Sequence, residues 1–260
     1  MTIPRNLFAL TLALGAIFST VTAVAQDATP KETRPRILVL YALSVENDHA
    51  LFALDALKFF SRMAERDNFI MDSSSKWEEL NDDSLKSYNL VVWLNNFPHN
   101  AAQREAFEKY MSNGGAWLGF HVSAYNDKNT KWPWFVNFVG GGAFDMNNWP
   151  PLPAKLIVND RTSPVTRNLP ETFQSPTNEW YRWKPSPRED KNIHVLITLD
   201  PENYPLGIRK LLTYGDVPVV WTNTNYKMLY MNMGHGDKIF TSPLQNTLIE
   251  NSTLWLLGKQ

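Results

Sequence analysis

Three of the five histidines follow short apolar segments that predict buried strands, and they have the clearest potential for chemistry: His49, His121 and His235. Loops at the carboxyl ends of parallel strands build the ligand site of an open sheet, so these side chains are predicted to converge. Neutral imidazole ligates metals, and its pKa lets it move protons near neutral pH. With Glu179 as a carboxylate partner, the residues predict an acid/base centre or a divalent metal site.

Glycines surround two of these histidines. Gly119 precedes His121 at a predicted sharp turn from strand to helix, which would present the imidazole to the cleft. Gly234 and Gly236 flank His235, and a backbone of this kind suits close approach by a ligand.

Structural roles are the competing interpretation. His49 could be a surface residue in the first turn of a helix, and Glu179 could be the ion-pair partner of Arg182. His99 and His194 do not stand at strand ends and are predicted to be solvated or structural.

Aromatic residues are the second chemical signal, at 13% of the chain. Flat rings suit the apolar faces of sugars, and Tyr and Trp add a polar group. Tyr181 is predicted to donate a hydrogen bond in the site. Four indoles are candidate substrate-binding residues: Trp132, Trp180, Trp183 and Trp221. The alternative is that each indole fills the core beneath a long loop.

Several sequence motifs are absent. The chain has no Cys and no GxSxG, so ordinary cysteine or serine acyl transfer is disfavoured. No P-loop, HExxH or CxxC is present either. A metal site would therefore be assembled from segments distant in the sequence.

An alternation of strands and helices must position these residues. Four apolar strand segments are predicted at 36–41, 69–72, 89–94 and 116–120. Helices are predicted between them at 46–66 and 100–111, and a short helix or turn at 82–88. Such βαβ units predict an α/β fold with a mostly parallel, doubly wound sheet and helices on both faces. The rhythm breaks at 125–190, which predicts long excursions with short strands. Later strands are predicted at 193–199, 217–222 and 228–233, before a helix at 243–257.

The first residues predict export. Arg5, the apolar run 7–18 and Ala23-Val-Ala25 are typical of a secretory signal peptide over 1–25, with an uncleaved membrane anchor as the alternative. A flexible tether at 26–34 and one domain at 35–260 would follow. We therefore expect a periplasmic or secreted protein that makes no membrane contact once the signal is removed.

The charge balance gives no argument for nucleic acid as a partner. Removing Arg5 with the signal leaves 24 of the 25 basic residues against 26 acidic ones, a net charge of −2. With no Cys there are no disulfides, so stability must come from an apolar core.

Several segments, in this order, resemble the trehalose-utilization, ThuA-like proteins: Gly114–His121, Ser163–Pro170, Asn178–Trp183, Pro218–Trp221 and Gly234–His235. The resemblance covers almost all of 35–258. It implies a flavodoxin-like sheet similar to that of class I glutamine amidotransferases. In that comparison His121 stands where those enzymes carry the nucleophilic Cys, and His235 stands near their catalytic His, which argues against glutamine hydrolysis.

The sequence departs from the pattern of the family in three places. In family members an acidic group commonly follows the equivalent of His121 within a few residues, whereas here Tyr125 and Asn126 stand before Asp127. Ser163 stands where members often have His, and Asn178 stands where they often have Asp. A site that depended on those side chains would be weakened.

The leading hypothesis is a carbohydrate-processing enzyme that acts on a glycoside or keto-sugar, since the family is associated with trehalose and related disaccharides. His121 and His235 would be acid/base or metal-ligating groups, Glu179 the carboxylate and Tyr181 the donor, while His49 would bind substrate or metal. A non-catalytic sugar-binding protein is the alternative, and a metal-dependent hydrolase of unrelated substrates is a third. The expected partner is a small-molecule carbohydrate, and a homo-oligomer is compatible with the sequence.

Overall fold

The apolar segments predicted as strands form the centre of a nine-stranded sheet in the computed structural model. The structure describes residue 1 and residues 33–127, 129–204 and 206–259. Apart from Met1, the predicted signal peptide lies outside the described residues, as does all but the end of the tether. None of the helices in the described ranges is both long and apolar enough to cross a membrane.

The sheet has the strand order β2-β1-β3-β4-β11-β10-β9-β6-β7. Its strands are β1 (Arg36–Tyr41), β2 (Ile70–Ser74), β3 (Leu90–Leu94), β4 (Ala116–Phe120), β6 (Leu152–Val158), β7 (Thr172–Asn178), β9 (Ile193–Leu199), β10 (Pro218–Asn223) and β11 (Lys227–Met231). The five strands from β2 to β11 pair in parallel, and the pairs from β11 to β7 are antiparallel. A second, two-stranded sheet pairs β5 (Ala143–Asn147) with β8 (Tyr181–Lys184).

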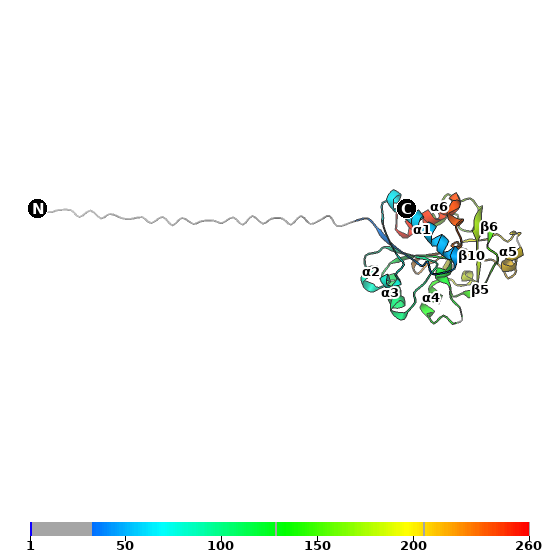
Figure 1. Ribbon diagram of the computed structural model, residues 1–260, viewed down its shortest axis with the longest axis horizontal. Coiled ribbons are helices and arrows are strands. Elements are labelled where there is room, and N and C mark those ends of the chain that lie inside the picture. Colours follow the sequence, from blue (N-terminus) through cyan, green and yellow to red (C-terminus); the bar gives the residue numbers. More distant parts are fainter. Residues whose placement is uncertain (2–32, 128, 205, 260) are drawn as a thin grey trace. The chain divides into compact units, whose positions relative to one another are not determined.

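Helices cover both faces of the main sheet (Figure 1). They are α1 (Asn47–Asp67), α2 (Asp82–Leu85), α3 (Ala101–Ser112), α4 (Pro133–Phe138), α5 (Leu206–Leu212) and α6 (Pro243–Leu256). The structure also has the short 3-10 turns η1 (Trp77–Glu79), η2 (His121–Ala124), η3 (Pro164–Thr166), η4 (Pro187–Glu189) and η5 (Ile239–Thr241). The predicted α/β fold with a flavodoxin-like, doubly wound sheet is confirmed.

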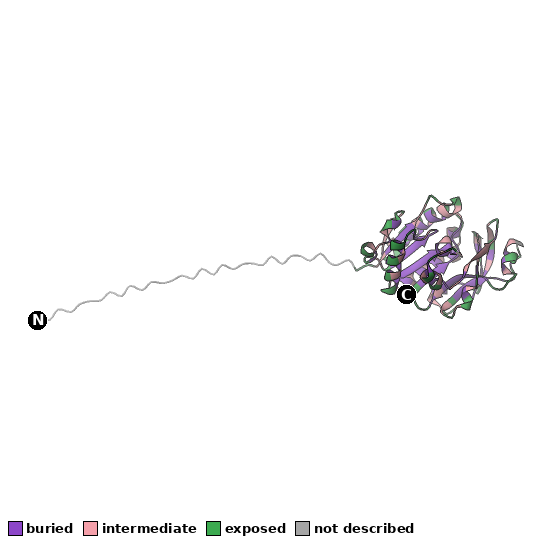
Figure 2. Ribbon diagram, turned by 90° about the horizontal axis from the view of Figure 1, so that it is seen from below, coloured by how far each residue is buried: buried purple, intermediate pink, exposed green. Residues whose placement is uncertain are grey.

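Alternation along β1 divides the core in two. Ile37 and Val39 pack into the cluster that includes α1 and α6, while Leu38 and Leu40 pack into the cluster that includes α2, α3 and α4. Both clusters are fully buried, and Figure 2 shows the buried positions concentrated in the strands and on the inner sides of the helices. A strand covered on both faces must be apolar throughout, which is why β1, β3 and β4 are continuous apolar runs.

The segment 125–190 was predicted to form long excursions from the sheet, but part of it belongs to the sheet. Two of its strands, β6 and β7, extend the main sheet. Residues in β6 alternate between buried and more exposed positions, so this strand has no continuous apolar signal. Antiparallel strands also need no crossover helix, so the alternation of strands and helices in the sequence does not predict them. The short helix α5 was likewise not predicted.

Candidate functional site

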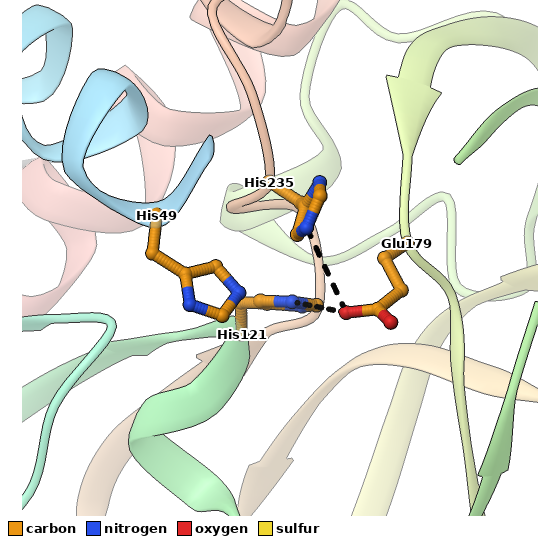
Figure 3. Close-up of side chains that lie close together, drawn as sticks. All are labelled: His49, His121, Glu179 and His235. Carbon is orange, nitrogen blue, oxygen red and sulfur yellow. Dashed lines mark hydrogen bonds and ion pairs between the residues drawn. The ribbon is translucent and has the colours of Figure 1, made fainter. Parts of the chain in front are cut away.

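Four side chains from distant segments converge at the carboxyl edge of the parallel strands (Figure 3). His49 lies in the first turn of α1, His121 directly follows β4, and His235 follows β11. Glu179 lies in the short link between β7 and β8. Because β1, β3, β4 and β11 are neighbours in the sheet, their carboxyl ends meet at this edge, and the predicted convergence is found.

The cluster is tight enough to surround one ion. One ligand atom from each of His49, His121, Glu179 and His235 lies within 4.8 Å of the others. The Oε2 atom of Glu179 is 3.2 Å from His121 Nε2 and 3.9 Å from His235 Nε2. The ring centroid of His49 is 5.1 Å from that of His121 and 5.0 Å from that of His235.

The backbone of His121 forms the predicted sharp turn. Its φ is +49°, in the left-handed region that a residue with a side chain rarely adopts. The hydroxyl of Tyr230 donates to the carbonyl oxygen of His121 at 3.0 Å, which holds this conformation. A Cβ on Gly234 would lie 2.6 Å from His121 Cβ, so only glycine lets the two loops approach this closely. Strain of this kind persists where the surrounding structure fixes it, which is common at functional sites.

The tautomer of His121 follows from its surroundings. The Nδ1 atom lies 3.0 Å from the carbonyl oxygen of Asn232, which can only accept, so Nδ1 carries the proton and donates. The amide nitrogen of Asn232 is farther from Nδ1, at 3.4 Å. Neutral His121 therefore points the lone pair of Nε2 at the carboxylate of Glu179. Two acceptors that face each other need a cation or a proton between them, and metal-ligating histidines have this backbone-carbonyl partner on the other ring nitrogen.

The protonation states suit a cation. Burial, reinforced by His121 and His235, lowers the pKa of His49 to about 4. Burial also lowers the pKa of His121, even though Glu179 acts to raise it. Burial acts to raise the pKa of Glu179, but its interactions with His121, and then with His235, whose protonated forms would pair with the carboxylate, hold it below its ordinary value. Near neutral pH the site therefore has neutral imidazoles on His49 and His121 beside an ionised carboxylate.

The loop that carries His235 is fixed by two asparagines. The Oδ1 atom of Asn178 accepts from the backbone nitrogens of Gly234 and His235 at 3.1 and 3.0 Å. The Nδ2 atom of Asn95 donates to the carbonyl oxygens of Gly234 and His49 at 2.6 and 3.3 Å. Asn178 thus fixes the loop that carries His235 through a side-chain oxygen, and an Asp at this position would also supply such an oxygen.

Segment 36–256 matches the family model described as Trehalose utilisation, ThuA. The chain belongs to the ThuA family. A solved ThuA-like protein from Bacteroides uniformis ATCC 8492 is 46% identical, with a TM-score of 0.83, and the match covers 90% of this chain and 96% of that one.

Two more distant solved structures share the fold. A ThuA-like protein from Parabacteroides merdae ATCC 43184 is 18% identical with a TM-score of 0.62, over 87% of this chain and 91% of that one. A beta-galactosidase from Bacillus circulans sp. alkalophilus is 12% identical with a TM-score of 0.54, over 86% of this chain and 31% of that one. At these identities the likeness shows the fold alone. No curated protein matches the chain.

The positions that depart from the ThuA pattern lie in different places. Asn178 supports the site, as described above. Ser163 caps η3, which packs against α6, and it is not one of the four clustered side chains. The departure at Ser163 therefore leaves this cluster of the ThuA chain intact.

Tyr181 is at the site as predicted. Its ring stacks on that of His121, with centroids 4.1 Å apart and an interplanar angle of 29°. Burial, followed by the charge of Glu179, raises the pKa of the Tyr181 phenol. The phenol therefore stays protonated and can donate. The carboxylate of Glu179 is held by Asn147, and Arg182 pairs with Asp145 instead, so the alternative partner for Glu179 is excluded.

The predicted tryptophan platform is not supported by the structure. All four indoles are at least 94% buried: Trp132, Trp180, Trp183 and Trp221. Trp180 donates its Nε1 hydrogen to the carbonyl oxygen of Leu152, and Trp221 donates to that of Val139. A stacking platform must expose a ring face, so these residues are core. Composition alone could not distinguish the two roles.

The sequence patterns did not indicate the roles of the polar residues that surround the cluster. Asn147 and Asn232 orient Glu179 and His121, but lone asparagines in loops carry no distinctive pattern. Glu46 caps α1 by accepting from Asp48 N and His49 N, and its Oε2 atom is also 3.5 Å from His235 Nε2. An acidic residue at the first position of the predicted helix 46–66 was the available signal. Glu46 and Asp48 place two further carboxylates at the rim.

A separate cleft lies at the opposite edge of the sheet. It has a volume of about 380 Å³, and Asn89, Gly115 and Lys227, at the amino ends of β3, β4 and β11, are among its lining residues. None of the four clustered residues lines it.

Proposed function

We propose that this ThuA protein is a carbohydrate-processing enzyme that acts on a glycoside or keto-sugar with the help of one divalent metal. The metal ligands are His49, His121, Glu179 and His235. The observation that carries the proposal is the Nε2 lone pair of His121, which faces the ionised carboxylate of Glu179. His49 and His235 lie close enough to both to bind the same ion. Membership in the ThuA family, described as Trehalose utilisation, supports a carbohydrate as the substrate.

The donor set favours a transition metal. Three imidazoles and one carboxylate suit Zn²⁺ and its neighbours in the first transition row, whereas Ca²⁺ and Mg²⁺ prefer oxygen. Ligands about 2.1 Å from a tetrahedral zinc are about 3.4 Å from one another. The separations of 3.2 and 3.9 Å between Glu179 and the two Nε2 atoms are close to this value.

The chemistry follows from the groups around the cluster. A bound divalent metal would polarise a sugar carbonyl, which acidifies the adjacent C–H bond. A carboxylate at the rim, Glu46 or Asp48, then accepts that proton, and the electron pair moves toward the carbonyl oxygen. Tyr181, which stays protonated, donates a hydrogen bond to an oxygen of the substrate. Elimination of a keto-sugar would continue with cleavage of the bond to the substituent on the next carbon, which would leave as an alcohol with the proton held by the rim carboxylate. Isomerisation would instead return that proton to the neighbouring carbon or its oxygen.

Turnover of keto-sugars tests this proposal. The purified protein, loaded with Zn²⁺ or Mn²⁺, would be screened against 3-keto-disaccharides and their parent glycosides, with product detected by NMR. Tyr181→Phe retains the ring stack on His121 but removes the hydroxyl, and is expected to lower kcat by about 100-fold, as loss of one hydrogen-bond donor to a developing oxyanion does. Sugar binding with no product from any candidate would instead identify a non-catalytic sugar-binding protein.

Asn178 gives a prediction about the departure from the ThuA pattern. Asn178→Leu is expected to weaken Zn²⁺ binding by about 10- to 100-fold, because the loop of His235 loses its acceptor. Asn178→Asp keeps that acceptor but loses the Nδ2 donor to the carbonyl oxygen of Glu179 at 2.8 Å, and should bind the metal more tightly than Asn178→Leu. Competition with a chromophoric chelator measures both affinities. Equal affinities in the two variants would show that the acceptor does not position His235.

We also propose that the chain is exported and that the signal is cleaved after Ala25. The supporting pattern is Arg5, the apolar run at 7–18 and Ala23-Val-Ala25. Expression of the full chain in a Gram-negative host should yield a periplasmic product whose N-terminal residue is Gln26, as read by intact mass. A product that retains Arg5 and sediments with membranes would identify an uncleaved anchor.

A further inference from the structure

The two ring nitrogens of His235 face different carboxylates. The Nε2 atom lies on the side of the cluster, 3.9 Å from Glu179 Oε2 and 3.5 Å from Glu46 Oε2. Figure 3 shows one ring nitrogen of His235 directed at Glu179 while the other points away. That other nitrogen, Nδ1, lies 3.5 Å from Asp48 Oδ2. The imidazole is only 2% exposed, so bulk water does not take the place of these groups.

A ligand role for Nε2 decides what Nδ1 must do. A neutral imidazole that gives its Nε2 lone pair to a cation carries its one proton on Nδ1. In His121 that proton is donated to the carbonyl oxygen of Asn232 at 3.0 Å. The Nδ1 atom of His235 is buried and has no such partner among the described residues. A buried N–H without an acceptor is destabilising, so the acceptor has to come from the group that faces it.

Asp48 is the acceptor within reach. Its carboxylate is 38% exposed, and none of the described residues donates a hydrogen bond to it. A shift of about 0.5 Å would bring it to the ordinary N–H···O distance of about 3.0 Å from Nδ1. The backbone already fixes the spacing of the two segments, because the backbone nitrogen of Gly236, the residue after His235, donates to the carbonyl oxygen of Asp48 at 3.0 Å.

The two carboxylates at the rim are therefore not equivalent. Glu46 Oε2 accepts from the backbone nitrogens of Asp48 and His49 at 2.9 and 3.2 Å, and it faces Nε2 of His235. Asp48 faces Nδ1 instead. A carboxylate that accepts from the outer nitrogen of a metal-ligating histidine forms a charge-assisted bond, fixes the tautomer and the ring, and makes the inner nitrogen a better ligand.

We infer that Asp48 is the positioning residue of His235: its carboxylate accepts the Nδ1 proton and so directs the Nε2 lone pair into the cluster. The inference rests on the proposed function for the cation that His235 binds. It also divides the roles at the rim, because a carboxylate bonded to Nδ1 does not act on a substrate. Glu46 is then the carboxylate that accepts the proton from the C–H bond.

Zinc affinity and NMR of the histidine ring test the inference without turnover. Asp48→Ala removes the carboxylate but leaves the backbone bond to Gly236, and is expected to weaken Zn²⁺ binding by about 10- to 100-fold in chelator competition. Asp48→Asn keeps an acceptor oxygen and should recover part of that loss. In the zinc-loaded native protein, with isotopically labelled histidine, the proton of His235 should be on Nδ1 and exchange slowly with water. It should exchange faster in Asp48→Ala, an effect that a change in folding stability alone would not confine to this ring.

Asp237→Ala is the matched control. Asp237 is an exposed carboxylate two residues from His235, and it pairs with Lys238 at 3.1 Å, outside the clustered ligands. Its removal changes the charge near the loop by the same amount as Asp48→Ala. The control should therefore retain the native zinc affinity and the slow Nδ1 exchange, and circular dichroism checks that each variant is folded.

Three results would overturn the inference. The first is zinc affinity and Nδ1 exchange that are unchanged in Asp48→Ala. The second is a ring proton on Nε2 of His235 in the zinc-loaded protein. The third is two zinc ions per chain that fall to one in Asp48→Ala, which would make Asp48 a ligand of a second ion.

The outcomes also separate this inference from the proposed function. Native zinc binding that does not depend on Asp48 would remove the inference alone, whereas a native protein without zinc affinity would remove both. Zinc binding that depends on Asp48, in a protein that turns over no sugar, would support the inference while removing the enzyme.

Discussion

His121→Ala is expected to lower the affinity for Zn²⁺ by more than about 100-fold, beyond the 10- to 100-fold that loss of an outer partner of a metal ligand costs. The Nε2 atom of His121 is the best-oriented ligand of the site, because the carbonyl oxygen of Asn232 fixes the tautomer and the ring. The turn at φ +49° fixes the backbone. Without the imidazole, Glu179 loses its 3.2 Å partner, and two histidines and one carboxylate remain.

Metal content after dialysis and chelator competition measure this effect in the purified protein. His194→Ala is the matched control, since His194 is half-exposed on β9 and pairs with Asp160 at 2.8 Å, apart from the cluster. The control should retain about one metal per chain with native affinity. Circular dichroism checks that His121→Ala remains folded. Native protein with no Zn²⁺, Mn²⁺, Co²⁺ or Ni²⁺ affinity, or a His121→Ala variant that binds as well as native, would remove the metal from the proposed chemistry.

The centre of the fold was predictable because its physical requirements are local. A strand buried on both faces is a continuous apolar run, and β1, β3 and β4 each show one. Helix α1 shows apolar residues at helical spacing and ends within one residue of its prediction. In contrast, β6 and β7 gain stability from pairing with strands far along the chain, and only long-range contacts specify them.

The candidate site was predictable for a related reason. Chain order places His49, His121 and His235 at the ends of strands, and parallel topology gathers those ends at one edge. The supporting side chains were not predictable, since Asn147 and Asn232 act through single hydrogen bonds across the fold. The tryptophans were assigned wrongly because composition does not report burial. Of the four, Trp132 borders a surface cleft, together with Phe97, Tyr125 and Phe135, and it is 94% buried there.

Gly119→Ala is expected to destabilise the protein by about 3 kcal/mol or more, at the upper end of what overpacking costs. The sequence favoured a role for Gly119 in presenting His121, but the geometry gives it a packing role. A Cβ at this position would lie 2.0 Å from the indole of Trp117, on the same strand, and 2.7 Å from Ser123 Oγ. Trp117 is fully buried and cannot withdraw, since Trp93 and Phe138 contact its ring at 5.4 and 5.3 Å.

The size of this effect follows from the rigidity of the aromatic core. Moving the Trp117 indole would shift rings that already contact one another, so the strain spreads instead of relaxing locally. For a domain of this size, such a loss corresponds to a decrease in Tm of about 6 to 12 °C. Gly207→Ala in α5 is the matched control, because the nearest atom to its added Cβ is a flexible methyl of Leu152 at 3.1 Å. The free energies of unfolding of the two variants, measured in urea, should differ by the predicted amount. Equal stabilities would show that the core around Trp117 repacks freely and would remove the packing role of Gly119.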